Sequence, residues 1–513
     1  MLASENGALR GGKVGGVGDV VRDLPLALAA AGWQISVATP SYGSLHRLPG
    51  AARLATVDVD FRGSVHSVDV WGIEVDTSGV KHIVFDHALF AQYGGGRIYH
   101  QDEAARPFAS DANTFAFFCA AAAQWISASD RRPDVVHLHD WHAAFYLILA
   151  KYDGQIAGIR DIRTVFTIHN LAYQGTRPFR GDASSLEAWY QNLQPDYATI
   201  VDPRYADCVN PMASAIRLAD RVSTVSPTYA DEICRPSNPE TGFIGGEGLE
   251  ADLSRARDDG RLNGILNGCY YDQPIGRRPG WQRLLSMIET QLQAWQKEQP
   301  SNEAHELALQ RLTSLPKRRP SHLMTSIGRL VEQKAALLLH EFDDGGTPLG
   351  RIAEAAGRGS VIVVLGSGDP HLEARMLQVA QHTPNLVFLQ GYSEDLAAPL
   401  YRGGDLFLMP SSFEPCGISQ MLAMRSAQPC VVHGVGGLKD TVDDGLTGFV
   451  FDGHSPDEQA REFIKTTARA LDIRSDDPIA WQNVCQAAAA CRFDWAAAAE
   501  KTIDTLYGEG NDR

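Results

Sequence analysis

One segment of the chain places a carboxylate just ahead of an expected helix start. In DLFLMPSSFEPCGISQMLAM, residues 405–424, a buried strand ends at Pro410 and a helix is expected to begin within 417–420. Free backbone N–H groups at such a start favour a phosphate, and Glu414 could face a sugar hydroxyl or a developing cationic anomeric carbon. The alternative interpretation is that Glu414 only caps the helix electrostatically.

Two cations follow another expected strand in the same half of the chain. SIGRLVEQKA, residues 326–335, carries Arg329 at the strand end and Lys334 five residues later. Positive groups are what a departing diphosphate needs, because charge grows as the sugar–phosphate bond breaks. Taken singly, each cation could equally be a solvated side chain.

Near the N-terminus a glycine-rich turn carries one positive charge. GGKVGGVGDVV, residues 11–21, contains Lys13 and leads into an expected helix, an arrangement that lets a backbone approach an anionic ligand. Glycines also serve ordinary strand-to-helix turns, so the pattern is ambiguous. Pro25 predicts a kink or a later helix start. Residues 1–5 resemble the tail of a buried strand whose first residues are missing, so we expect either that the true start lies a few codons upstream or that the edge of the sheet is shortened.

The end of a further expected strand carries side chains suited to sugar. DVVHLHDWHAA, residues 134–144, places Asp140 and Trp141 at a carboxyl edge, where a carboxylate can accept hydrogen bonds from hydroxyls and an indole can pack on a pyranose. The histidines suggest a metal. We expect none, because no partner cluster stands at ligand spacing and alternation puts His137 and His139 on one face, with Asp140 pointing away.

A fourth expected strand ends in TVFTIHNLAYQG, residues 164–175, with His169 and Asn170 at its carboxyl end. A single histidine is more often structural than functional, so His169 alone decides nothing.

Short β-rich runs alternate with Ala/Leu-rich helical stretches along the chain, which predicts βαβ units and parallel sheets. The alternation stops between Gly268 and Pro320. We therefore predict two α/β halves that share one cleft at the carboxyl ends of their strands. The predicted parts are an N-terminal domain, a linker with helices, a C-terminal domain and a terminal helix that packs back on the first domain: 1–268, 269–320, 321–490 and 491–513.

Composition excludes several classes of partner. The 513 residues carry a net charge of −16, which opposes binding to nucleic acid or to an anionic membrane. No apolar run reaches the roughly 18 residues of a membrane span. The eight cysteines form no CxxC pair, which is typical of reduced thiols, and we expect a cytoplasmic protein.

Taken together, the blocks resemble, in order and spacing, the signatures of bacterial glycogen synthases and plant starch synthases, the retaining synthases of glycosyltransferase family five. The resemblance spans nearly the whole chain. It implies a GT-B fold, in which two Rossmann-like, doubly wound domains face an interdomain cleft, the first binding the acceptor and the second the nucleotide sugar. The blocks that carry it are KVGGVGDVV, HLHDWHAA, TIHNLAYQG, STVSPTYADEI, GILNG, GRLVEQK, VVLGSGD, GYSEDL, MPSSFEPCG, GGLKDTV and TGFVF.

The resemblance also implies roles for individual residues, with no cofactor and no metal. The catalytic group is Glu414, His169, Asp140, Arg329 and Lys334. The donor-binding group, in which Tyr392 stacks on the base, is Lys13, Gly15, Gly16, Arg329, Lys334, Tyr392, Cys416, Gly417, Ile418 and Ser419. The acceptor-side group is Asp19, Asp140, Trp141, His142 and Asn267.

The implied reaction is transfer of glucose from ADP-glucose to the non-reducing end of an α-1,4-glucan, with retention. Leu422 stands where many related transferases carry a second Glu, so we expect same-face attack in which the leaving phosphate accepts the proton. The preference for ADP rests on the resemblance alone. Two alternatives stay open: a UDP-glucose-using transferase of the same fold with another acceptor, and a non-catalytic homologue that binds glucan or nucleotide sugar.

Overall fold

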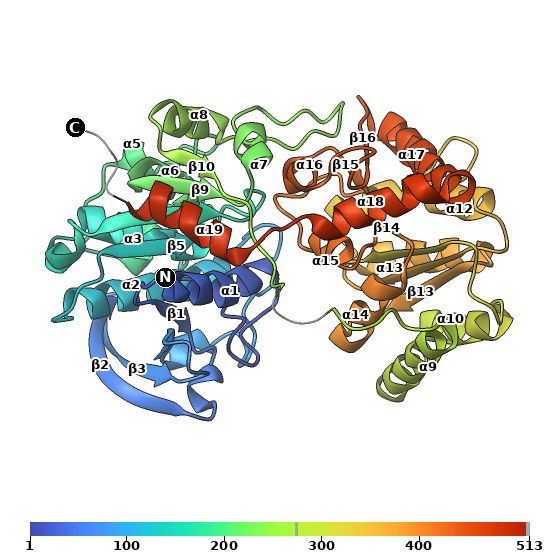
Figure 1. The fold of residues 1–513 in the computed structure, drawn as a ribbon. Coiled ribbons are helices and arrows are strands. Elements are labelled where there is room, and N and C mark those ends of the chain that lie inside the picture. The colour runs from blue at the N-terminus through green and yellow to red at the C-terminus, as the bar shows by residue number, and fades with distance from the viewer. Residues whose placement is uncertain (272–274, 509–513) are drawn as a thin grey trace. The chain divides into compact units, whose positions relative to one another are not determined.

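The computed structural model describes residues 1–271 and 275–508, which form two compact units (Figure 1). Unit 1 contains residues 1–237 and 245–268 and the chain from 495 onward. Unit 2 contains residues 238–244 and 269–494. Each unit is an α/β structure built on parallel strands, which confirms the predicted fold class.

The sheet of unit 1 is centred on the first residues of the chain. Leu2 bridges in parallel to Ala38 on one side and to Leu138 on the other, which confirms the predicted strand tail. The side with Ala38 runs β1 (Ser36–Pro40), β4 (Lys81–Asp86), β3 (Ser64–Ile73) and β2 (Ala51–Phe61). The side with Leu138 runs β5 (Val135–His139), β6 (Arg163–Ile168), β9 (Arg221–Thr224) and β10 (Leu262–Gly264), all parallel.

Helices of unit 1 pack around this sheet. α2 (Ala109–Ser127) is buried along most of its length and packs on α3 (Asp140–Tyr152). α1 (Gly16–Ala30) runs through Pro25, so the later helix start is wrong. The remaining helices are α4 (Leu186–Trp189), α5 (Tyr197–Ile200), α6 (Pro211–Leu218), α7 (Pro227–Glu232), α8 (Glu250–Asp258) and α19 (Trp495–Thr502).

The end of the described chain belongs to unit 1. α19 packs against α1, and the Tyr507 ring lies 5.0 Å from the Trp33 ring. The Tyr507 hydroxyl also hydrogen-bonds His137 Nδ1 at 2.7 Å. The part of the predicted terminal helix beyond residue 508 lies outside the described residues.

Unit 2 contains one six-stranded parallel sheet whose order reverses between its third and fourth strands. The order is β13 (Leu386–Gln390), β12 (Val361–Gly366), β11 (Leu323–Ile327), β14 (Leu406–Met409), β15 (Cys430–His433) and β16 (Phe449–Phe451). β12 is buried along its whole length, as expected for a parallel strand covered on both faces. A reversal of this kind is where open α/β sheets bind ligands, and here it falls between β11 and β14.

Helices cover the sheet of unit 2. The expected linker, residues 269–320, contains α9 (Trp281–Glu298) and α10 (Glu303–Ser314), and the stretch 272–274 lies outside the described residues. α9 buries Trp281, Leu284, Ile288 and Leu292. The other helices are α11 (Glu332–Leu339), α12 (Pro348–Ala355), α13 (Pro370–His382), α14 (Glu394–Gly403), α15 (Ser419–Arg425), α16 (Gly436–Thr441), α17 (Pro456–Asp476) and α18 (Pro478–Ala490). Across the described residues, no helix is long and apolar enough to cross a membrane.

Candidate functional site

The reversal point of unit 2 brings together a cation and a carboxylate from two neighbouring strands. Lys334 lies in the first turn of α11, after β11, and Glu414 lies in the loop that follows β14. Lys334 Nζ is 3.0 Å from Glu414 Oε2, and the Glu414 side chain is buried. The Ser411 hydroxyl donates a second hydrogen bond to the same oxygen at 3.1 Å. The two residues named separately from the sequence therefore form one polar centre.

Backbone contacts hold the loop that carries Glu414. The Ser412 N–H donates to the Gln333 carbonyl at 2.8 Å, which ties this loop to α11 beside Lys334. On the other side, the Gly437 N–H donates to the Glu414 carbonyl at 3.1 Å. A Cβ at Gly436, whose φ is +43°, would overlap that same carbonyl oxygen. The glycine-rich turn at 434–437 thus lets two backbones approach closely and fixes Glu414.

The other predicted donor residues of unit 2 lie around this centre at different strand ends. Arg329 follows β11 and is exposed, and its guanidinium forms no hydrogen bond or ion pair with the residues that the structure describes. Tyr392 follows β13, two strands away, with 60% of its surface exposed. Cys416, two residues after Glu414, is buried, and Gly417 adopts φ +77°. Ile418 and Ser419 are half-buried at the start of α15, a helix of only seven residues.

In unit 1 the loop with Lys13 is organised by a residue that the sequence did not single out. Glu5 is buried at the end of the central strand segment, and its Oε2 accepts hydrogen bonds from the N–H groups of Val14 and Gly15, each at 2.7 Å. The Tyr99 hydroxyl donates to Glu5 Oε1 at 2.8 Å. The Gly15 N–H is therefore already engaged by a carboxylate, and the donor-binding role implied for Gly15 stays a prediction. The sequence does contain a signal for Glu5, because this acidic residue stands at the end of a short apolar run.

Lys13 itself is half-exposed and paired. Its Nζ lies 2.6 Å from Asp19 Oδ1 in the first turn of α1, and Arg22 lies 3.1 Å from the same oxygen. Gly15 is the N-cap of α1 and Gly16 its first residue. The structure thus brings Lys13 and Asp19, predicted for donor and acceptor sides, into one contact.

Asp140 and His169 meet at the carboxyl ends of the neighbouring strands β5 and β6. Asp140 Oδ1 accepts the His169 N–H at 2.7 Å and the Asn170 N–H at 3.4 Å. Asp140 also has a left-handed φ of +56°, a conformation that is strained for a non-glycine residue and concentrates at functional sites. Burial raises the pKa of the Asp140 carboxyl to about 7, and the same cause lowers the pKa of His169 to about 4.

Trp141 and His142 are in the wrong place for a sugar platform. Trp141 is 1% exposed, its ring packs on Phe108 and Phe115, and a Cβ at Gly175 would overlap it. The predicted stacking of Trp141 on a pyranose is therefore corrected, because α3 turns the indole inward. His142 is also buried, with its ring 4.6 Å from that of Phe115. Burial lowers the pKa of His142 to about 3, so His142 contributes packing.

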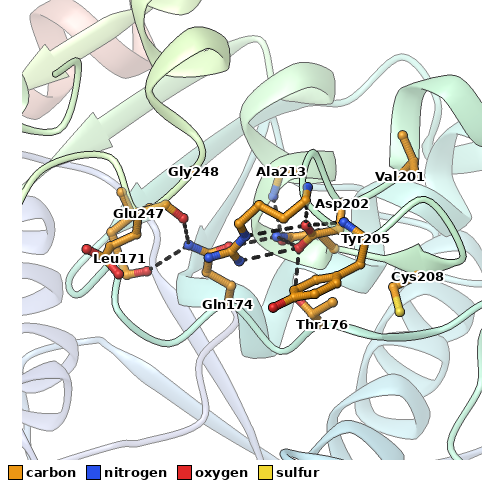
Figure 2. Close-up of polar contacts among 12 residues, drawn as sticks. Leu171, Gln174, Thr176, Val201, Asp202, Tyr205, Cys208, Ala213, Glu247 and Gly248 are labelled. Carbon is orange, nitrogen blue, oxygen red and sulfur yellow. Dashed lines mark hydrogen bonds and ion pairs between the residues drawn. The ribbon is translucent and has the colours of Figure 1, made fainter. Parts of the chain in front are cut away.

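A buried hydrogen-bond network fixes the far end of the loop that begins at His169 (Figure 2). Gln174 Nε2 donates to the Leu171 and Glu247 carbonyls at 3.3 and 3.0 Å. Its Oε1 accepts from Asn210 and from Arg204, both at 2.8 Å.

At the centre of the network is Asp202. Its Oδ2 accepts from Asn210 at 2.8 Å and from the Thr176 hydroxyl at 3.0 Å. Burial alone would raise the Asp202 pKa, but hydrogen bonds from Arg204 and Asn210 and the charge of Arg204 lower it below its ordinary value. The loop is thus held at both ends, by Asp140 and by Asp202. Sequence reasoning missed the network because its members come from separate segments.

The last predicted acceptor-side residue, Asn267, lies three residues beyond β10 and is half-buried. The histidines of β5 behave as alternation predicted: the His137 and His139 rings stack 4.4 Å apart. Within residues 1–271 and 275–508, no three His, Cys, Asp or Glu side chains are placed to hold a metal ion.

Comparison with known proteins agrees with this geometry. A family model described as the starch synthase catalytic domain matches residues 1–255, and one described as glycosyl transferases group 1 matches residues 322–469. Glycogen synthases of Anaeromyxobacter sp. (strain Fw109-5) and Deinococcus radiodurans are 34% and 32% identical to the chain, and each alignment covers 96% of both proteins.

Among solved structures, the catalytic domain of starch synthase IV from Arabidopsis thaliana, bound to ADP and acarbose, matches with a TM-score of 0.77 and 27% identity over 99% of this chain and 98% of that one. A sucrose-phosphate synthase from Thermosynechococcus elongatus, at 17% identity and a TM-score of 0.55, shares the fold. The chain therefore belongs to the glycogen and starch synthase family of hexosyltransferases, which have the GT-B fold.

Proposed function

We propose that the protein transfers glucose from ADP-glucose to the non-reducing end of an α-1,4-glucan, with retention, in the cytoplasm. Glycogen synthases related over nearly the full length, and a starch synthase structure bound to ADP and acarbose, support this donor and acceptor. The observation that carries the proposal is the contact of Lys334 with Glu414 at the reversal point of the unit 2 sheet.

Unit 2, including residues 321–490, is proposed to bind the nucleotide sugar. Arg329 and Lys334 would neutralise the diphosphate as the sugar–phosphate bond breaks, which is the kind of charge stabilisation that lowers such barriers most. Tyr392, with its exposed ring, would stack on the base, and the backbone at Cys416, Gly417, Ile418 and Ser419 would approach the phosphates.

Glu414 has a different role in this proposal. Its carboxylate is held by Lys334 and Ser411, so it is an oriented acceptor for a sugar hydroxyl and an electrostatic partner for the cationic anomeric carbon. Leu422, eight residues later, is not a carboxylate, and a double displacement would need a nucleophile. The leaving phosphate would then accept the acceptor proton on the same face of the sugar.

Unit 1, which contains residues 1–237 and 245–268, is proposed to bind the acceptor. Lys13 would reach the donor phosphates, with Gly16 at the helix start beside it. Asp19, Asp140, His169 and Asn267 would contact glucose or the glucan. Asp140 accepts two backbone N–H groups through Oδ1, so its contribution includes holding His169 in place.

The decisive experiment compares ADP-glucose with UDP-glucose as donor, each with and without glycogen, for the wild type and for Glu414→Ala. We expect incorporation from ADP-glucose only when glycogen is present, and loss of most of kcat in Glu414→Ala. Turnover that prefers UDP-glucose or a small acceptor would favour the alternative transferase. Binding of ADP-glucose and glucan without turnover in the wild type would identify a non-catalytic homologue.

A further inference from the structure

Two histidines from neighbouring strands form a direct ring-to-ring hydrogen bond in unit 1. His139 is the last residue of β5 and His169 follows the end of β6. The parallel register pairs His139 with Thr167, so the two side chains rise from the same edge of the sheet. His139 Nδ1 and His169 Nε2 are 2.9 Å apart, and both rings are buried.

The surroundings keep the His139 ring neutral. The His137 ring stacks flat on it, with an interplanar angle of 20°, and both nitrogens of His137 are already occupied by Tyr507 and Thr167. A positive charge on His139 would therefore be buried beside two other imidazoles, with no carboxylate bonded to the ring anywhere in residues 1–271 or 275–508. Burial lowers the pKa of His139 far below its ordinary value.

If both His139 and His169 are neutral, only one arrangement of their protons avoids a buried N–H without a hydrogen-bond partner. His139 Nε2 is buried and has no hydrogen-bond partner among the described residues. If that nitrogen carried the proton, a buried N–H would be left unpaired, and such orphaned donors are the rarest unsatisfied groups in proteins. With the proton on Nδ1, His139 donates to His169 Nε2 and leaves only a lone pair unsatisfied. His169, itself neutral, must then carry its proton on Nδ1.

We propose that His139 is a positioning residue that fixes His169 in the Nδ1–H tautomer, so that His169 serves the reaction as a hydrogen-bond donor to a sugar hydroxyl oxygen and not as a general base. His169 Nε2 is engaged by His139, whereas no partner of His169 Nδ1 exists in the described part of the chain. Asp140 fixes the His169 backbone at the same time.

The contact of His169 with sugar rests on the proposed function, but the tautomer can be tested without turnover. Selective ¹⁵N-histidine labelling of the full chain, with the His169 resonances assigned by difference from His169→Asn, reports which nitrogen is protonated. We expect a protonated Nδ1 and an unprotonated Nε2 at neutral pH. A protonated His169 Nε2 in the wild type would overturn the inference, whatever the activity of the enzyme.

Two variants of His139 separate donation from packing. In His139→Asn the amide nitrogen can take the place of Nδ1, whereas His139→Leu fills similar space without a donor. We expect His139→Leu to let His169 populate both tautomers and to lower kcat by about 10- to 100-fold with a smaller change in KM, by analogy with the loss of the partner that orients a metal-bound histidine. His139→Asn should restore most of both. Equal loss in the two variants, or an unchanged tautomer in a folded His139→Leu protein, would contradict the inference.

Discussion

Lys334 Nζ lies 3.0 Å from Glu414 Oε2, and the two residues come from loops that follow adjacent strands of one parallel sheet. The carboxylate is buried, while the lysine keeps about a quarter of its side chain exposed. The cation is thus oriented by a group that a sugar can also contact. The pair couples the part of the site suited to phosphate with the part suited to glucose.

Because the two charges are in contact, the effects of replacing Lys334 and Glu414 on activity should not be additive. We expect Lys334→Ala and Glu414→Ala each to lower kcat by about 10²- to 10³-fold, as removal of a transition-state stabilising group does. The kcat of the double variant should be at most a few-fold below that of the less active single variant, because each single change already disrupts the other residue. A double-mutant cycle on kcat/KM measures this.

The exposed ion pair of Glu462 with Lys465 on α17 provides the control cycle. Alanine at either position should leave kcat unchanged, because the pair is solvated and distant in sequence from the site. Fully additive losses at Lys334 and Glu414 would contradict the proposed coupling.

Gly436→Ala should displace Glu414 and lower activity. An added Cβ would overlap the Glu414 carbonyl oxygen, so the loop would have to shift. Gly445→Ala is the matched control, because it also has a positive φ, +73°, but the described structure leaves no heavy atom within 4 Å of the new Cβ. Both variants should lose about 1–2 kcal/mol of stability to backbone strain. Only Gly436→Ala should lose kcat, by at least about tenfold.

Gly175→Ala should disturb the loop that carries His169, because its Cβ would overlap the buried Trp141 ring. We expect a loss of about 2–4 kcal/mol in the free energy of unfolding, combining strain with overpacking. Gly181→Ala, with φ +80° and open space among the described atoms, should lose only the strain. Equal urea midpoints for the two variants would rule out a packing role for Gly175.

Glu5→Gln should raise KM for the nucleotide sugar about tenfold with a smaller effect on kcat, because hydrogen bonds to a charged acceptor are among the stronger ones. The carboxylate accepts the Val14 and Gly15 N–H groups that shape the loop around Lys13. Glu74→Gln, at an exposed position, is the control and should change neither constant. An unchanged KM in Glu5→Gln would show that this loop does not position Lys13.

Acidification should destabilise unit 1. Burial lowers the pKa of His137, His139, His142 and His169, so the unfolded chain gains up to four protons below pH 6.5 that the folded chain does not. Asp140 has the opposite effect. Its pKa is raised to about 7 in the folded state, so on acidification the folded chain binds this proton at a higher pH than the unfolded chain does. Burial also raises the pKa of Asp23 and Asp111, which oppose the effect in the same way, and it lowers the pKa of His82 and His87, which add to it. The six histidines outweigh the three carboxyls, so stability should fall as the pH drops from about 6.5 toward 4.

His142→Leu isolates one of these contributions. Between pH 7.5 and pH 5, the free energy of unfolding of His142→Leu should fall by about 2 kcal/mol less than that of the wild type. The reason is that the unfolded variant lacks one histidine that takes up a proton over this range. Urea unfolding at the two pH values measures the slope, and parallel curves for His142→Leu and the wild type would contradict the assignment.

The fold class and the positions of Lys334, Glu414, Asp140 and His169 could be predicted because each depends on a local signal. An apolar run followed by polar residues marks the carboxyl end of a parallel strand, and such ends gather at one edge. The direction of a side chain depends on longer-range packing. Trp141 was misplaced for that reason: a left-handed Asp140 precedes it and Gly175 leaves room for its ring.

The missed residues share another property. The partners of Glu5 lie 9 to 94 residues away from it in the sequence. Those of His139 and Asp202 lie on a different strand or loop. The local sequence pattern around each of these residues predicts that it is buried but not which residue it contacts. Contacts of this kind become visible only when the strands are placed in register.

The central claim is glucosyl transfer from ADP-glucose to a glucan, and one measurement tests it directly. Purified protein is incubated with ADP-[¹⁴C]glucose and glycogen, and the labelled polymer is digested with an exo-acting hydrolase specific for α-1,4 linkages at non-reducing ends. We expect label to enter the polymer and the hydrolase to release it. Folded protein that binds ADP-glucose and glycogen but incorporates no label, or label that this hydrolase cannot release, would contradict it.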